Sequence, residues 1–270
     1  EAIAAFRKAL SLKPKNAEAY NNMGNTLKRQ GKLEEAIAAF NRALAIKPDY
    51  AEANHMVSSL IGKTTNAAPR KYVENLFDGY ATKFDQSLVG ELAYDIPKVL
   101  TQLAVQKQGK SSLGSIIDLG CGTGLTGVQI REFCSYLEGI DLSSKMLALA
   151  KIKNVYDKLS HVDIVEYLSN AEMDFDYFIS TDVFIYVGEL SEVFRLIKSR
   201  NKKSGKLIFS TEHTEKEGFH LEKSGRYSHS MSYIEGLCKK FKFSISHFSE
   251  TNLRKEEGAF LIGGLYLLDF

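Results

Sequence analysis

Long apolar runs are missing from this 270-residue chain. No uninterrupted stretch approaches the ~20 residues that a membrane-spanning helix needs, so we expect no membrane segment. Cysteine is also scarce, because Cys121, Cys134 and Cys238 are the only three. Their odd number and scatter exclude a disulfide framework and a site of closely spaced metal ligands. We therefore expect a reducing compartment, the cytoplasm, and no bound metal.

An excess of either charge is missing as well. The chain has 35 Lys and Arg residues against 33 Asp and Glu residues, which gives a net charge of +2. This balance excludes a strongly basic nucleic-acid binder and an acidic tail protein as descriptions of the whole chain. Basic and aromatic residues do not interleave along any stretch, so we expect no nucleic-acid partner.

The amino-terminal part contains an internal repeat. Residues 1–6 read EAIAAF, and residues 35–40 read EAIAAF again, at an offset of 34. Pro14 and Pro48 follow the two copies at the same offset. A period of this length is typical of stacked helix–turn–helix units.

The stretch 17–50 resembles a tetratricopeptide repeat (TPR). Gly24 and Ala36 are small where two helices must approach closely, Phe40 fills the space between them, and Pro48 ends the second helix. The resemblance implies a surface that docks a peptide or a partner protein. A structural appendage or a dimer contact is the other interpretation, and the sequence does not decide between them.

Composition divides the chain into three parts. We predict TPR helices over 1–62, a linker and further helices over 63–112, and a region of strands and helices over 113–270. That the second part covers a cofactor and the third is a catalytic core is what the resemblance of the third part, given below, implies. Because the chain begins at Glu1 inside a repeat copy, we expect it to be a piece of a longer repeat protein.

From residue 113 onward, apolar strands alternate with helices. The segments 115–119, 136–143, 175–181 and 205–211 are the clearest strands. This alternation predicts an α/β fold with a mostly parallel sheet covered on both faces, and ligands in such sheets bind beyond the carboxyl ends of the strands.

A glycine-rich turn follows the first of these strands. Gly122, Gly124 and Gly127 match the G-x-G-x-x-G pattern of dinucleotide-binding proteins, and on its own that match is weak. Asp118 stands near the tip of the strand, where an acidic residue suits the ammonium of an amino acid better than a diphosphate, which would call for a helix N-terminus. The residues favour a ligand with an amino-acid part, and a nicotinamide cofactor stays open as the alternative.

The segment 118–124, DLGCGTG, resembles the first motif of class I S-adenosylmethionine (SAM)-dependent methyltransferases. The resemblance covers roughly residues 70–270 and, with the repeats, extends to a bacterial group of TPR-containing methyltransferases. It implies a Rossmann-like sheet of seven strands, SAM as methyl donor and S-adenosylhomocysteine (SAH) as product. A SAM-binding interaction protein with little catalysis and an NAD(P)-dependent oxidoreductase are the alternatives.

The same resemblance assigns cofactor contacts. Asp141 would accept hydrogen bonds from the ribose hydroxyls, Asp163 would accept from the adenine amine, and aromatic residues of an earlier helix would lie over the cofactor. The predicted cofactor-binding residues are Tyr80, Phe84, Asp118, Gly120, Cys121, Gly122, Gly124, Leu125, Asp141, Leu142, Met146, Asp163, Ile164 and Thr181.

The methyl acceptor is harder to infer. Amide and exocyclic-amine methyltransferases carry an Asn-Pro-Pro-Tyr-like tetrad where this chain reads TDVF at 181–184, so those acceptors are disfavoured. A small molecule or a protein side chain remains. The charged run Arg254–Glu257 is expected to be a solvated loop. The predicted catalytic residues are Asp182, His213 and His229, and the predicted substrate contacts are Tyr186, Arg226 and Tyr227.

Overall fold

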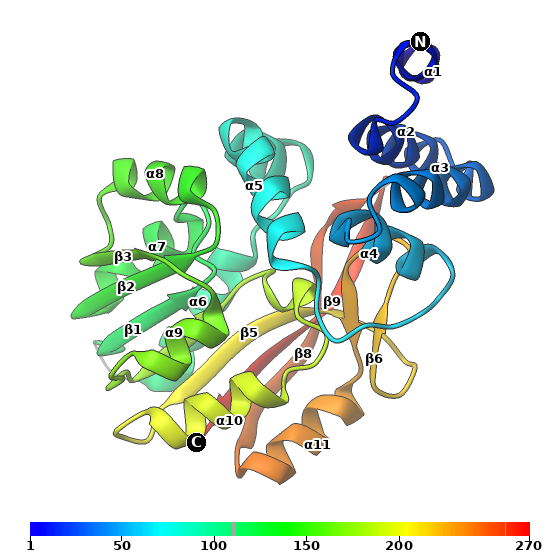
Figure 1. Cartoon of the computed structure of the whole chain (residues 1–270). Coiled ribbons are helices and arrows are strands. Elements are labelled where there is room, and N and C mark those ends of the chain that lie inside the picture. Colours follow the sequence, from blue (N-terminus) through cyan, green and yellow to red (C-terminus); the bar gives the residue numbers. More distant parts are fainter. Residues whose placement is uncertain (110–111, 257) are drawn as a thin grey trace. The chain divides into compact units, whose positions relative to one another are not determined.

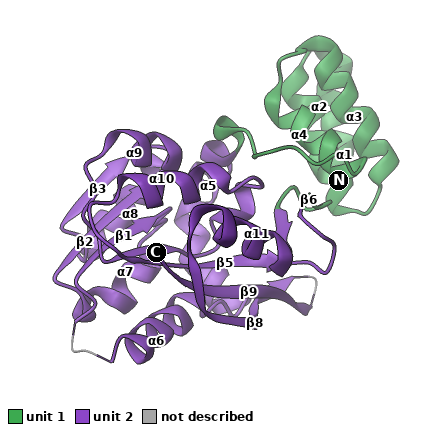
Figure 2. Ribbon diagram, turned by 90° about the horizontal axis from the view of Figure 1, so that it is seen from below, with its two compact units in different colours: residues 1–72, 220–226 green, residues 73–219, 227–270 purple. Residues whose placement is uncertain are grey.

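A computed structural model describes residues 1–109, 112–256 and 258–270. The described chain forms two compact units (Figure 2). Unit 1 contains residues 1–72 and 220–226, and unit 2 contains residues 73–219 and 227–270. Among the described residues, no helix has both the length and the apolar character that crossing a bilayer requires.

Unit 1 is built from paired helices, as the repeat predicts. A Cβ at Gly24 would lie 2.7 Å from Cε1 of Phe40, so the glycine lets the two helices of the repeat approach closely. Phe40 and Ala36 are fully buried between them. Asn16 caps the second helix, since its side chain accepts a hydrogen bond from the Ala19 N–H. The helices are α1 (Ala2–Leu12), α2 (Ala17–Arg29), α3 (Leu33–Ile46) and α4 (Ala51–Leu60).

Unit 2 is built on one twisted sheet (Figure 1). Its order is β3-β2-β1-β4-β5-β7-β6, and β9 pairs antiparallel with both β5 and β8. The neighbours from β3 to β5, and β5 with β7, run parallel. The strands are β1 (Ser115–Leu119), β2 (Tyr136–Asp141), β3 (Lys158–His161), β4 (Tyr177–Ser180), β5 (Lys206–His213), β6 (Phe219–Leu221), β7 (Tyr227–His229), β8 (Ser244–Glu256) and β9 (Ala259–Asp269).

The mostly parallel α/β sheet is confirmed, but its predicted strand number is wrong. Across the described ranges, the sheet has nine strands, not seven. The two extra strands are β6 and β7, and each has three residues. A strand of three residues is too short to give an alternating apolar pattern that the sequence could reveal.

Helices cover both faces of the sheet, and β4 shows how its side chains divide between them. Phe178 points to one face and packs with α9, α10 and α11. Tyr177 and Ile179 point to the other face and pack with α6 and α7. This is the period of two expected for a strand that is buried on both sides. The helices of unit 2 are α6 (Ile96–Gln108), α7 (Leu125–Ile130), α8 (Ser144–Lys153), α9 (Ile164–Asn170), α10 (Ser191–Arg200) and α11 (Met231–Phe241).

One further helix precedes the sheet. Helix α5 (Arg70–Asp85) continues as a π-helical turn over Gln86–Glu91. Residues 70–91 are therefore helical, and the helix type changes at residue 86.

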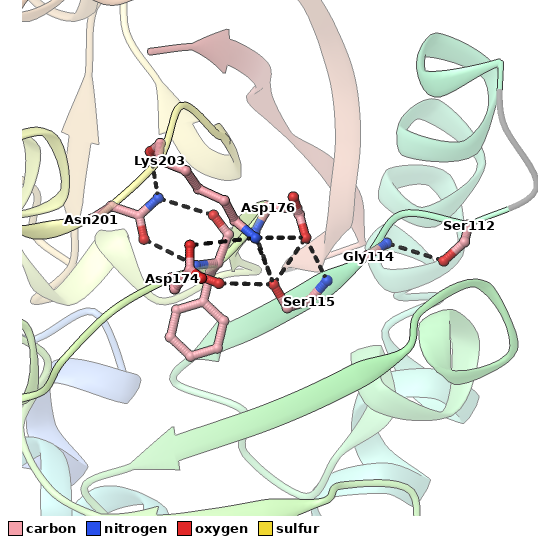
Figure 3. Close-up of polar contacts among 8 residues, drawn as sticks. Ser112, Gly114, Ser115, Asp174, Asp176, Asn201 and Lys203 are labelled. Atoms are coloured by element: carbon pink, nitrogen blue, oxygen red, sulfur yellow. Dashed lines mark hydrogen bonds and ion pairs between the residues drawn. The ribbon is translucent and has the colours of Figure 1, made fainter.

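A polar network closes the amino ends of β1 and β4 (Figure 3). The Ser115 N–H and hydroxyl both donate to Oδ2 of Asp176, across 2.8 and 2.9 Å. Lys203 Nζ lies 3.2 Å from the same oxygen. Since parallel strands share their direction, the opposite edge of the sheet holds the carboxyl ends, where the glycine loop lies.

Candidate functional site

The carboxyl end of β1 carries the acidic residue of the glycine motif. Asp118 is fully buried, and the Tyr156 hydroxyl donates a hydrogen bond to its Oδ2 across 2.7 Å. Its Oδ1 is buried too and has no hydrogen-bond partner among the residues that the structure describes. Burial raises the pKa of Asp118 to about 7, while the bond from Tyr156 lowers it. A buried oxygen left in this way suits a ligand that brings a donor, such as an ammonium.

Residues 120–124 form the turn between β1 and α7. Gly120 has a φ of +82°, and a Cβ there would lie 2.5 Å from Cγ2 of Val183, so glycine is required. Its N–H donates to the Ile140 carbonyl across 2.9 Å. A Cβ at Gly122 would meet no atom within 4 Å, so the main chain is open on that side.

Asp141 ends β2 and joins the glycine loop to the next turn. Its Oδ2 accepts from the Gly122 N–H across 2.9 Å, and its Oδ1 accepts from the Ser143 N–H across 2.7 Å. Burial raises the pKa of Asp141, although both N–H groups lower it. Because β1 and β2 are parallel neighbours, Asp118 and Asp141 stand at the same edge of the sheet.

Helix α5 is fastened to the loops after β1 and β2. Asp85 accepts a hydrogen bond from the Thr123 hydroxyl, and its Oδ2 lies 2.6 Å from Lys153 Nζ. Asp78 accepts from the Ser143 hydroxyl across 2.5 Å. Sequence analysis missed both carboxylates. Their separation of seven residues, two helical turns on one face, was the available signal.

The predicted aromatic residues lie on this same helix. The Tyr80 and Phe84 rings meet edge to face at 5.7 Å, and Phe77 meets Tyr186 edge to face at 5.3 Å. Tyr186, a predicted substrate contact after β4, therefore contacts α5. The role of Tyr80 and Phe84 toward a cofactor stays a prediction.

The predicted adenine side lies along α8 and α9. Met146 is buried on α8. His161 Nε2 lies 2.7 Å from the Leu142 carbonyl, and because a carbonyl only accepts, this nitrogen carries the hydrogen. Oδ1 of Asp163 caps α9 by accepting from the Val165 and Glu166 N–H groups. The cap uses Oδ1, so the predicted adenine contact would fall to Oδ2.

Asp182 follows β4 in an unusual conformation. Its φ is +56°, in the left-handed region that non-glycine residues rarely adopt. Its N–H donates to the Ser210 hydroxyl across 2.9 Å. Its Oδ1 is buried without a hydrogen-bond partner among the described residues. Thr181, just before it, places its hydroxyl oxygen 2.8 Å from that of Thr126.

Arg254 is a site residue that sequence analysis missed. The expectation of a solvated loop at this position is wrong, because β8 continues to Glu256 and the Arg254 side chain is only 8% exposed. Its guanidinium pairs with Oδ2 of Asp182 and with Oε1 of Glu212, the latter across 2.5 Å. The formal charges of these three side chains sum to −1.

The predicted histidines lie in different surroundings. His229 is fully buried on β7, and its Nε2 lies 3.1 and 2.9 Å from the carbonyl oxygens of Val187 and Gly188, so it is the donor. Burial lowers the pKa of His229 to about 4. His213, at the end of β5, has Nε2 3.5 Å from Oε1 of Glu215.

The last two predicted substrate residues fall in different units. Tyr227 is buried in unit 2, and a Cβ at Gly188 would lie 2.5 Å from its ring. Arg226 belongs to unit 1. The structure thus brings Asp118, Asp141 and Asp182 to one edge of the sheet, whereas Arg226 lies in the other unit.

One cluster of metal-ligand type occurs in the part of the chain that the structure describes. The ligand atoms of His213, Glu215 and Glu250 lie within 4.8 Å of one another. The side chains of Glu215 and Glu250 are 92% and 57% exposed, and nothing else at this cluster points to an ion.

Comparison with protein families matches both parts of the chain. Residues 110–256 match the family model of a methyltransferase domain. Residues 17–50 match the tetratricopeptide repeat model, and residues 1–31 match a second TPR model.

Individual relatives are distant. A protein of Geobacillus sp. (strain WCH70) named as a methyltransferase is 26% identical over 187 residues, 66% of this chain and 73% of that protein. Malonyl-[acyl-carrier protein] O-methyltransferase of Bacillus cereus is 26% identical over 144 residues. That match spans 52% of each chain, about half the length of the relative.

Solved structures share the fold at low sequence identity. Magnesium protoporphyrin IX methyltransferase from Synechocystis PCC 6803, solved with bound SAM, gives a TM-score of 0.57 at 17% identity. That alignment covers 76% of this chain and 99% of the other. A Burkholderia thailandensis 1,6-didemethyltoxoflavin-N1-methyltransferase gives a TM-score of 0.56 at 13% identity, over 76% and 92% of the two chains.

Proposed function

The chain belongs to the methyltransferase-domain family, and on this premise we propose that it transfers a methyl group from SAM to a hydroxyl or amine of a small molecule or a protein side chain. The repeats would serve protein interaction. The observation that carries the proposal is the pair of buried carboxylates at the tips of β1 and β2. One of them keeps a buried oxygen that has no hydrogen-bond partner in the part of the chain that the structure describes.

The residues present fit SAM. Oδ1 of Asp118 would accept from the ammonium of its methionine part, the open main chain at Gly122 would face its carboxylate, and Asp141 would accept from the ribose. SAM supplies a methyl group already activated on a sulfonium, so the protein mainly has to hold both reactants in line and keep water away.

Asp182 would receive the proton of the acceptor. Its main chain is fixed by Ser210 and its Oδ2 by Arg254, while Oδ1 is left to accept from an O–H or N–H group. Bound SAM would supply the methyl group and keep the electrons of the C–S bond as SAH. Oδ1 of Asp182 would take the proton that the acceptor loses when its lone pair bonds to the methyl carbon. Strained main chain at such a position is common at functional sites.

A carboxylate acceptor is the second candidate, because the Bacillus relative is named as an O-methyltransferase of a malonyl group. The electrostatics favour the first candidate. Asp182 and Glu212 place two carboxylates beside one guanidinium in a buried position, so a further carboxylate would meet like charges there.

Calorimetric titration with SAM, SAH and NAD tests the cofactor. We expect SAM and SAH to bind and Asp141→Ala to weaken both by at least about tenfold, roughly 1.4 kcal/mol. Asp174→Asn is the matched control, because Asp174 is an exposed carboxylate at the opposite edge of the sheet. Tight binding of NAD with indifference to SAH would overturn the assignment.

Methyl transfer from labelled SAM into fractionated cell extract tests the acceptor. We expect label in the wild type and the Asp174→Asn control, and its loss in Asp182→Asn while SAH binding persists. A label released by mild base would identify a methyl ester and so a carboxylate acceptor. If the protein binds SAH but no fraction takes up the labelled methyl group, the result would favour an interaction protein whose core does not catalyse methyl transfer.

A further inference from the structure

A hairpin from the second half of the sequence belongs to the repeat unit. The chain leaves unit 2 after Phe219, contributes residues 220–226 to unit 1, and returns at Tyr227 (Figure 2). The tip is a closed turn, because the Glu222 N–H donates to the Arg226 carbonyl across 2.8 Å. This hairpin begins with the last two residues of β6 and ends directly before β7.

The repeat helices hold this hairpin by its main chain. Lys28 Nζ of α2 donates to the Ser224 carbonyl across 2.7 Å. Nε2 of His55, on α4, lies 2.9 Å from the Gly225 carbonyl and is the donor, because a carbonyl only accepts. His55 is 3% exposed, so this bond is shielded from water. Because these bonds are made to main-chain carbonyl groups, they depend on the backbone conformation of the hairpin more than on its side chains.

Gly225 makes the fit specific. Its φ is +91°, and a Cβ there would lie 2.6 Å from Cε of Met56, which is itself buried. The Tyr72 ring lies 5.2 Å from the His55 ring and completes the surroundings of this tip. A residue other than glycine would therefore strain the turn and displace the Met56 methyl group, which is the end of a flexible side chain.

We propose that the face formed by Lys28, His55, Met56 and Tyr72 is a receptor for the chain's own 220–226 hairpin. A foreign partner that uses this face has to offer a similar glycine turn and displace the hairpin. The alternative is that the hairpin does not occupy this face stably and that the face is open to any peptide. The test below distinguishes the two.

Docking of the hairpin has a consequence for the core through chain connectivity alone. The hairpin runs directly into β7, which pairs with β5 through Glu212↔Ser228 and His213↔His229. Glu212 pairs with Arg254 in the cluster that holds Asp182. A partner that displaces the hairpin would thus act on β7, which is paired with the strand that carries Glu212. This consequence for the acceptor site rests on the proposed function, whereas the docking of the hairpin does not.

Limited trypsin digestion of the full chain tests the docking without any need for activity. Lys223 and Arg226 are cleavage sites within the hairpin. A protease needs a segment that opens locally, so docking should protect both bonds. We expect His55→Ala to speed cleavage at these two sites by about tenfold, the effect of losing one buried hydrogen bond. The control variant Lys32→Met changes an exposed lysine of the same repeat, and it should be cleaved at these two sites at the wild-type rate.

A glycine pair separates docking from turn strain. Gly225→Ala and Gly218→Ala place alanine at nearly the same φ, +91° and +92°, but only the Cβ at 225 meets Met56, whereas that at 218 meets nothing within 4 Å. We expect faster cleavage at Lys223 and Arg226 in the first variant only. Equal cleavage in wild type, His55→Ala and Gly225→Ala would overturn the proposal. SAH titration of each variant reports on the core independently, so failure of the docking and failure of the proposed function are distinguishable.

Discussion

The Tyr156 hydroxyl donates to one oxygen of Asp118 across 2.7 Å and leaves the other buried without a partner among the described residues. This half-satisfied carboxylate has a pKa raised to about 7 by burial. Its charge is therefore set by conditions near neutrality, unlike that of an exposed aspartate.

Cofactor binding should depend on pH through Asp118. Below pH 7 the carboxyl is largely protonated and cannot pair with an ammonium, so we expect SAH affinity to fall by about tenfold for each unit of pH below 7 and to level off above it. Calorimetry between pH 5.5 and 8 measures this. Asp118→Asn should bind weakly at every pH in that range, and a variant that keeps the slope would assign it to another group.

The stability of the free protein should respond to pH in the opposite sense. An acid whose pKa is raised on folding holds its proton more tightly in the folded chain. Asp118 therefore contributes stability below its ordinary pKa of 3.8, and this contribution is lost as the pH rises through about 7. Comparing the pH dependence of the unfolding free energy in wild type and Asp118→Asn isolates the contribution. Parallel curves would show that Asp118 titrates normally.

Tyr156→Phe should weaken SAH binding and shift its pH midpoint upward. The substitution removes the hydrogen bond that favours the ionised form of Asp118, so the pKa of Asp118 should rise further. It should also cost about 1–3 kcal/mol of stability, because a buried acceptor loses its donor. Tyr136→Phe is a matched control: this tyrosine donates to Glu138 on β2, away from the glycine loop. An unchanged midpoint in Tyr156→Phe would contradict the expectation.

Arg254→Met should destabilise the fold by about 3–5 kcal/mol, because it leaves the carboxylates of Asp182 and Glu212 buried without their cation. Urea unfolding measures the loss. Lys255→Met changes the exposed neighbour and should stay within about 0.5 kcal/mol. Adding Asp182→Asn and Glu212→Gln to Arg254→Met should restore part of the stability, and no recovery would argue against an electrostatic cause.

Gly24→Ala should destabilise the repeat by about 1–3 kcal/mol, since the new Cβ would overlap the Phe40 ring. Gly236→Ala in α11 is the contrasting variant. A Cβ there meets nothing within 4 Å, so alanine should stabilise that helix by up to about 1 kcal/mol. Thermal unfolding monitored by circular dichroism compares the two. Equal shifts would show that helix propensity, not packing against Phe40, dominates.

The sequence predicted those features that depend on local patterns. The 34-residue offset predicted the helix pairs of the repeat, and the apolar strands ending in Asp118 and Asp141 predicted two neighbouring tips of a parallel sheet. Each of these depends on residues that are close together in the chain.

The features that the sequence did not reveal are set by distant contacts. Arg254 reads as part of a charged loop, and only the course of β8 and the carboxylates of Asp182 and Glu212 make it a buried residue. Strands β6 and β7 are too short for a periodic signal. The docking of Gly225 depends on Met56 and His55, 169 and 170 positions away, which no local pattern reports.

The contact between α4 and the 220–226 hairpin also bears on how this protein can be divided. Two stretches far apart in sequence share one folded body, so a cut through the linker yields neither half intact. A chimaera that grafts the repeats onto another catalytic domain would need the hairpin as well, and a core expressed alone would expose a turn shaped for a missing neighbour. The folded units of this protein therefore do not coincide with continuous segments of its sequence.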